Sequence, residues 1–171
     1  KGFGHHVGAL LPGLVQLRSS DSFTKALAGI RCRAKITLMI DGRAEAAEEG
    51  ELQFTDYGIS GIPVFQLSRI AAGTLKNRKD VKVLVDFFPE QEEKTFAYMS
   101  RLRYGAHKDM PLENYFTGTL NKKINMVLIR QAGLKPQMKA EDAGWDKIWK
   151  LAQSSKAFAI HIERVNPMEN A

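Results

Sequence analysis

The stretch of sequence from residue 33 to residue 42 reads Arg33-Ala34-Lys35-Ile36-Thr37-Leu38-Met39-Ile40-Asp41-Gly42. Its apolar side chains alternate with polar ones, and this period of two predicts a β-strand with one buried face. Asp41-Gly42 then favours a two-residue hairpin turn, because both positions tolerate a positive φ. The stretch therefore predicts a β-hairpin whose returning strand runs from Arg43 to Glu48.

Outside the hairpin, the same alternation predicts strands around Leu52 and Phe54, over residues 81–87 and over residues 158–163. Apolar residues three and four apart predict helices over residues 22–28, 62–75, 90–104, 120–132 and 141–153. Pro89 is expected in the first turn of the third of these helices, and Gly105 is expected to end it.

The order of these elements predicts an α+β fold, because strands are followed by a block of helices and then by one more strand. We expect a β-barrel-like mixed unit, residues 1–88 and 156–171, interrupted by a small all-α helical subdomain, residues 89–155. The last strand is expected to return to the first sheet and to bring the chain ends together. Such an arrangement suits a segment inserted into a larger protein, and the start at Lys1 without a methionine fits that interpretation.

Composition narrows the classes of protein. Cys32 is the only cysteine among 171 residues, which excludes an internal disulfide and a cysteine-based zinc cluster. We expect its thiol to be packed rather than nucleophilic. The sequence has no apolar run near 18 residues, so no membrane partner is expected, and one thiol is typical of a reducing, cytoplasmic compartment. The net charge of +6 is spread along the chain, which indicates a solvated basic surface rather than a nucleic-acid site.

The most unusual local chemistry lies in residues 54–63, Phe-Thr-Asp-Tyr-Gly-Ile-Ser-Gly-Ile-Pro. A strand ends there, two glycines bracket a serine, and a helix opens with Pro63 in its first turn. Ser60 is expected to cap that helix, with the amides of Gly61 and Ile62 pointing out of its N-terminus. Such amides bind an anion or a partially negative oxygen. The turn could face a carboxylate, a phosphate or the carbonyl edge of a flavin, or it could be a well-capped strand-to-helix turn.

Other candidate sites are weaker. Neither GxGxxG after a strand nor GxxxxGK[ST] occurs, so the chain lacks the usual glycine-rich phosphate loops. His5 and His6 have no further ligand at a suitable spacing, and no metal site is predicted. His161 lies opposite the apolar face of its strand, where a surface or interdomain contact is expected. Trp145 and Trp149 are expected to pack in the core.

Three segments resemble the NAD(FAD)-utilizing dehydrogenase family of bacterial flavoproteins, also described as YhiN-like, BaiN-like or aminoacetone-oxidase-family FAD-binding enzymes. They are Gly4-His5, residues 11–17 (LPGLVQL) and residues 50–68 (GELQFTDYGISGIPVFQLS). Order and spacing agree along the whole chain. Asp56 stands where the family often has histidine, and Ile62 separates Gly61 from a proline that usually follows directly. Any role of that histidine therefore does not transfer to Asp56.

The resemblance implies that the chain is the flavin- and substrate-covering insert of a bacterial FAD-dependent NAD(P)H oxidoreductase, without the FAD-binding domain. The implied partners are that flavin-binding domain of the same polypeptide and a small-molecule substrate. FAD is expected in the intact enzyme but not on this chain, and NAD(P)H is a candidate reductant. The residues expected to face flavin or substrate are Thr55, Asp56, Tyr57, Gly58, Ile59, Ser60 and Gly61; no catalytic residue is assigned. The alternatives are a basic nucleic-acid-binding module and a non-catalytic interaction domain.

Overall fold

A computed structural model describes residue 4, residues 12–77 and residues 79–167. Its centre is an antiparallel seven-stranded sheet in the order β6-β5-β2-β3-β4-β1-β7. The strands are β1 (Leu17–Arg18), β2 (Arg31–Ile40), β3 (Arg43–Thr55), β4 (Gly58–Ser60), β5 (Val81–Asp86), β6 (Phe158–His161) and β7 (Arg164–Val165). The helices are α1 (Thr24–Leu27), α2 (Ile62–Lys76), α3 (Glu93–Ala106), α4 (Lys122–Gln131), α5 (Ala140–Ala143) and α6 (Trp145–Lys156), with a 3-10 turn, η1, at Leu112–Asn114. The mixed α+β class is therefore confirmed.

The β2–β3 hairpin forms as its sequence predicts. Asp41 and Gly42 have φ angles of 49° and 79°, which are the positive values that a two-residue turn with both centres left-handed requires. The returning strand is longer than expected, because β3 continues without interruption from Arg43 to Thr55. Gly50 lies inside this strand and leaves room for Pro63 of α2, whose Cδ would lie 3.2 Å from an added Cβ.

One short segment of chain joins the two edges of the sheet. Residues 158–161 pair with β5, and residues 164–165 pair with β1. Between them, the Ile162 N–H donates to the Val81 carbonyl at 2.9 Å and the Glu163 N–H donates to the Arg18 carbonyl at 3.0 Å. The ladder itself stays open, with β6 and β7 at its edges. The predicted return of the last strand to the first sheet is confirmed, since Leu17 lies opposite Val165.

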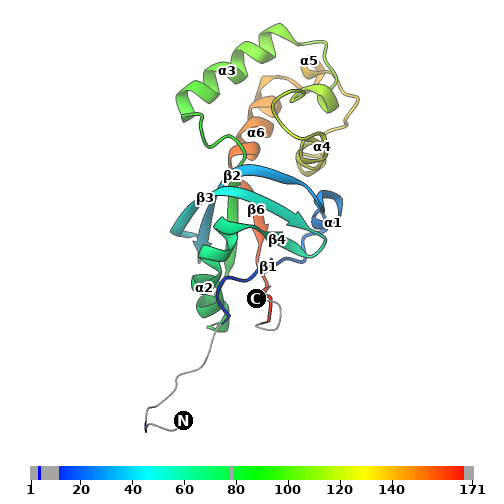
Figure 1. The fold of residues 1–171 in the computed structure, drawn as a ribbon. Helices are drawn as coiled ribbons and strands as arrows, with labels where there is room; N and C mark the ends of the chain where they lie inside the picture. The colour runs from blue at the N-terminus through cyan, green and yellow to red at the C-terminus, as the bar shows by residue number, and fades with distance from the viewer. Residues whose placement is uncertain (1–3, 5–11, 78, 168–171) are drawn as a thin grey trace.

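The helices lie at both ends of the sheet. Figure 1 shows α3, α4, α5 and α6 gathered at one end of the molecule, with α2 near the other. One hydrophobic cluster runs through both regions and includes Phe54 of β3, Phe158 of β6 and Ile148 of α6. A division into two units at residues 88 and 156 stays a prediction.

The third helix begins later than its sequence signals suggest. Pro89 and Glu90 lie in a turn before α3, which starts at Glu93, and Gly105 lies inside the helix, which ends at Ala106. The Lys156 ammonium explains the delayed start, because it binds the carbonyls of Phe88 and Gln91 at 2.8 and 2.9 Å. It also pairs with the Asp86 carboxylate at 2.9 Å.

Two further helix predictions need correction. The helix predicted over residues 141–153 is two helices, α5 and α6, because Gly144 takes a φ of 79° between them. The first helix is a single turn, Thr24–Leu27, in place of the span 22–28. Across the described ranges, no helix is long and apolar enough to cross a membrane.

Two glycines permit close approaches of backbone to backbone. A Cβ added to Gly58 would lie 2.0 Å from the Leu17 carbonyl oxygen, and one added to Gly61 would lie 2.2 Å from that of Glu51. Gly61 also has a φ of 112°. A side chain at either position would force neighbouring strands apart, so both glycines are required by packing.

The substitution Gly61→Ala should lower the free energy of unfolding by about 3 kcal/mol or more, because the clash and the backbone strain add. Urea unfolding monitored by circular dichroism measures this change. Gly105→Ala is the matched control, since an added Cβ there meets no atom within 4 Å, and it should be neutral or stabilising by up to about 1 kcal/mol. Equal stability of the two variants would contradict the packing explanation.

Candidate functional site

The predicted turn at residues 54–63 contains a short strand that the sequence pattern does not predict. Thr55 ends β3, Asp56 and Tyr57 form the turn, and residues 58–60 form β4 between β3 and β1. Gly58, Ile59 and Ser60 are consequently buried within the sheet. The seven predicted site residues thus stay together, but the middle of the segment faces the core rather than a ligand.

The helix cap differs from the prediction. Gly61, and not Ser60, is the N-cap of α2, and its carbonyl accepts the Phe65 N–H at 3.0 Å. Ser60 is only 5% exposed, because it lies in β4 opposite Gln53. Gly61 is partly exposed and Ile62 is 72% exposed. The part of the predicted turn that a ligand or partner can reach is therefore the start of α2.

Tyr57 is held at the point where β1 and β7 meet. Its hydroxyl donates to Gln16 Oε1, which also accepts from Asn166 Nδ2. The Arg18 guanidinium lies over the Tyr57 ring, 4.5 Å from the ring centroid, in a cation–π contact. Gln16 and Asn166 are 150 positions apart. Tyr57 is partly exposed and helps to hold the two ends of the described chain together.

Two buried polar atoms near this turn lack hydrogen-bond partners within the described part of the chain. They are Asn166 Oδ1 and Thr55 Oγ1. Buried polar groups are nearly always paired, so each is an acceptor or donor that a neighbouring chain segment or water would satisfy. Asn166 directly follows β7, and Thr55 is the last residue of β3.

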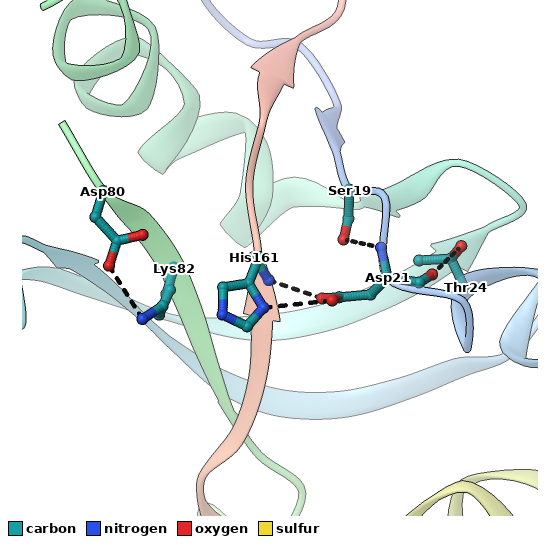
Figure 2. A network of polar contacts seen from close by, with 6 residues as sticks. All are labelled: Ser19, Asp21, Thr24, Asp80, Lys82 and His161. Carbon is teal, nitrogen blue, oxygen red and sulfur yellow. Dashed lines mark hydrogen bonds and ion pairs between the residues drawn. The ribbon is translucent and has the colours of Figure 1, made fainter. Parts of the chain in front are cut away.

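Asp21, which follows β1, pairs with His161 at the end of β6, as Figure 2 shows. The His161 N–H donates to Asp21 Oδ2 at 2.8 Å, and His161 Nδ1 lies 3.3 Å from Asp21 Oδ1. Thr24 Oγ1 donates to the carbonyls of Asp21 and Asp56 at 2.9 and 3.1 Å. The predicted turn is thereby linked to this pair. No local pattern indicates this pairing, because its members are 140 residues apart.

Two exposed apolar residues lie at the same end of the β1–β4 ladder. Leu17 lies opposite Ile59 in antiparallel register, so Leu14 and Ile62, each three residues further along, extend towards the same side. Leu14 is 67% exposed. The Val15 N–H donates to Ser68 Oγ of α2 at 3.2 Å and fixes this segment against the helix. We refer to Leu14 and Ile62 as the α2 patch.

The remaining sequence candidates have structural roles. Burial and, to a smaller extent, the Glu51 carboxylate raise the pKa of the Cys32 thiol to about 11. Trp145 and Trp149 stack on each other with ring centroids 5.8 Å apart, and Arg101 covers the Trp145 ring at 4.5 Å. His5 and His6 lie outside the described residues. Among those described, no three metal-ligating side chains come together.

Comparison with known proteins identifies the family to which this chain is similar. The family model described as the HI0933-like protein barrel and H2TH domain matches residues 11–171. The chain is also similar to a 3-dehydro-bile acid delta(4,6)-reductase of Clostridium scindens, with 35% identity over 179 residues. That alignment covers 100% of this chain and 42% of the reductase, so the chain spans less than half of that relative's length. The resemblance found in the sequence is confirmed.

The raised pKa of Cys32 predicts an unreactive thiol. A shift from 9.0 to about 11 leaves about 100-fold less thiolate at pH 8. Reaction with Ellman's reagent at pH 8 should therefore be at least about 100-fold slower for the folded chain than for the chain in urea. Similar rates in both conditions would show that the thiol is accessible and ionised normally.

Proposed function

Because the chain belongs to the HI0933-like barrel and H2TH domain family, we propose that it is the flavin- and substrate-covering part of a bacterial FAD-dependent oxidoreductase. The observation that carries the proposal is the full-length similarity of this chain to part of a reductase. The remainder of such an enzyme would supply the flavin-binding domain. We further propose that the intact enzyme acts in the cytoplasm and that NAD(P)H is its reductant.

The glycines of the predicted turn do not form a cradle for the pyrophosphate of FAD. A pyrophosphate bound at a helix N-terminus needs open backbone amides and glycines with free space above them. The two glycines of the predicted turn have no such space, since Gly58 abuts the Leu17 carbonyl and Gly61 abuts that of Glu51. The flavin would therefore be held by other segments of the enzyme, and this chain would contact it from outside.

The α2 patch is the surface that we assign to this contact. Leu14 and Ile62 are exposed apolar side chains beside the paired strands β1 and β7, and burying them against a flavin-binding domain is favourable. The Tyr57 hydroxyl reaches Gln16, two residues from Leu14, and adds an aromatic ring to this region. These residues would exclude water and position the turn at residues 55–61 over the flavin or substrate.

The substrate class follows from the relative only as a proposal. The Clostridium scindens protein is named as a reductase of a 3-dehydro-bile acid, and we propose that the enzyme containing this chain likewise reduces a small organic molecule.

The stacked Trp145 and Trp149 rings offer little support for the alternative of nucleic-acid binding, because Arg101 and Tyr104 cover the Trp145 ring.

Ile62→Glu tests the assignment in the full-length enzyme. Placing a charge in the contact with the flavin-binding domain should weaken flavin retention by about tenfold or more. The readout is the visible absorbance per protein molecule after gel filtration. Tyr98→Glu on α3, at an exposed apolar residue far from the patch (63% against 72% for Ile62), is the matched control and should retain flavin. Undiminished flavin in the Ile62→Glu enzyme would rule out the α2 patch as the contact.

A further inference from the structure

A cavity in the helical region lies between α3 and the chain segments before and after it. Its volume is about 120 Å³. Three phenylalanine rings line it, those of Phe88 before α3, Phe96 of α3 and Phe116 after η1. The Phe88 ring centroid lies 5.3 Å from that of Phe96 and 6.4 Å from that of Phe116. The lining is therefore mainly apolar, as it is in most small-molecule sites.

One face of α3 supplies a whole wall of this cavity. Phe96, Met99, Ser100 and Arg103 all belong to the lining. Their three- and four-residue spacing places them on the same side of the helix. Phe96 and Ser100 are 4% and 9% exposed, whereas Met99 is 53% exposed. The cavity therefore reaches from the buried side of α3 to the surface, and a ligand can enter past Met99.

The Lys156 ammonium holds the opposite wall in place. It binds the carbonyls of Phe88 and Gln91 at 2.8 and 2.9 Å, and both of these residues line the cavity. The same ammonium lies 5.3 Å from the centroid of the Phe96 ring. The cavity walls are thus fixed by contacts within the chain, which lowers the entropic cost of binding a ligand.

The positive charge of Arg103 is not neutralised by the chain around it. Arg103 Nε donates to the Tyr115 carbonyl and Nη2 donates to the Thr117 carbonyl, and both of these acceptors are neutral. Within the described ranges no carboxylate forms an ion pair with Arg103, whereas Lys156 pairs with Asp86 at 2.9 Å. A guanidinium has five N–H donors. Arg103 therefore keeps donors for an anion at the edge of the cavity.

We propose that this cavity binds a small carboxylic acid with one apolar six-membered ring, which lies among the phenylalanine side chains while the carboxylate pairs with Arg103. An apolar cavity of roughly 150 Å³ holds benzene, so the volume suits a single ring and excludes a whole flavin or nucleotide. A single guanidinium suits a singly charged carboxylate, whose two oxygens match its fork of donors. The cavity is remote from the α2 patch, because α2 and α3 lie at opposite ends of the molecule in Figure 1. This inference is independent of the proposed function.

Titration of the isotope-labelled chain with 3-phenylpropanoate, followed by NMR, tests the site. We expect saturable shifts, largest at the amides of residues 88–119, with a dissociation constant on the order of 1 mM for a ligand of this size. The alcohol 3-phenylpropan-1-ol lacks the charge and propanoate lacks the ring, so each should bind at least about tenfold more weakly. Equal binding of the alcohol, shifts that do not saturate, or shifts centred on other residues would overturn the proposal.

Two substitutions test the two parts of the site separately. Ser100→Leu would fill the cavity and should abolish binding of 3-phenylpropanoate, while the urea midpoint stays unchanged or rises. Arg103→Gln should weaken binding by at least about tenfold. Arg101→Gln is the matched control, because it removes the same charge from the same helix at a side chain that covers Trp145 instead, and it should bind as the unchanged chain does.

Unchanged affinity in either the Ser100→Leu or the Arg103→Gln chain overturns the proposal. So does an intact enzyme that does not bind 3-phenylpropanoate although the chain alone binds it, since another part of the enzyme would then cover the cavity.

Discussion

The closing segment, residues 158–165, is the constraint on which the rest of this structure depends. Its first half completes one edge of the sheet by pairing with β5, and its second half completes the other by pairing with β1. Each of these pairings joins residues far apart in sequence, so each carries the entropic cost of closing a long loop. The hydrogen bond from the His161 amide to the Asp21 carboxylate adds a third connection at the bend. This one segment therefore spans both edges of a sheet whose hydrogen-bonded ladder stays open.

The backbone contacts around β4 explain why the predicted turn contains glycines. Strand β4 has only three residues and lies between β3 and β1. In so short a strand the neighbouring backbones approach closely, and the space that Gly58 and Gly61 leave is filled by carbonyl oxygens. A glycine-rich stretch that looks like a ligand cradle is here a condition of strand packing. The accessible part of the segment is reduced to its two ends, the Asp56–Tyr57 turn and the start of α2.

The sequence predicts well those features that depend on neighbours in the chain. The β2–β3 hairpin follows from Asp41-Gly42 and from the alternation before it, and α2 follows from helical spacing, with bounds within one residue of those observed. The start of α3 is missed because it depends on Lys156, more than sixty residues away. Strand β4 is missed because three residues cannot show a period. The Asp21–His161 and Tyr57–Gln16–Asn166 contacts arise only once the sheet closes, so no local pattern indicates them.

The contacts of the Lys156 ammonium join the two points where the helical region connects to the sheet. Residue 85 pairs directly with residue 158, and the Lys156 ammonium binds Asp86, Phe88 and Gln91 at the same place. Residues 87–157 therefore leave the sheet after β5 and return to it at β6, and these two points lie side by side. The entropic cost of closing a loop rises only slowly with its length. The inserted region can therefore be lengthened, shortened or exchanged with little effect on the stability of β5 and β6. The same sheet can therefore carry helical insertions of different length in related proteins.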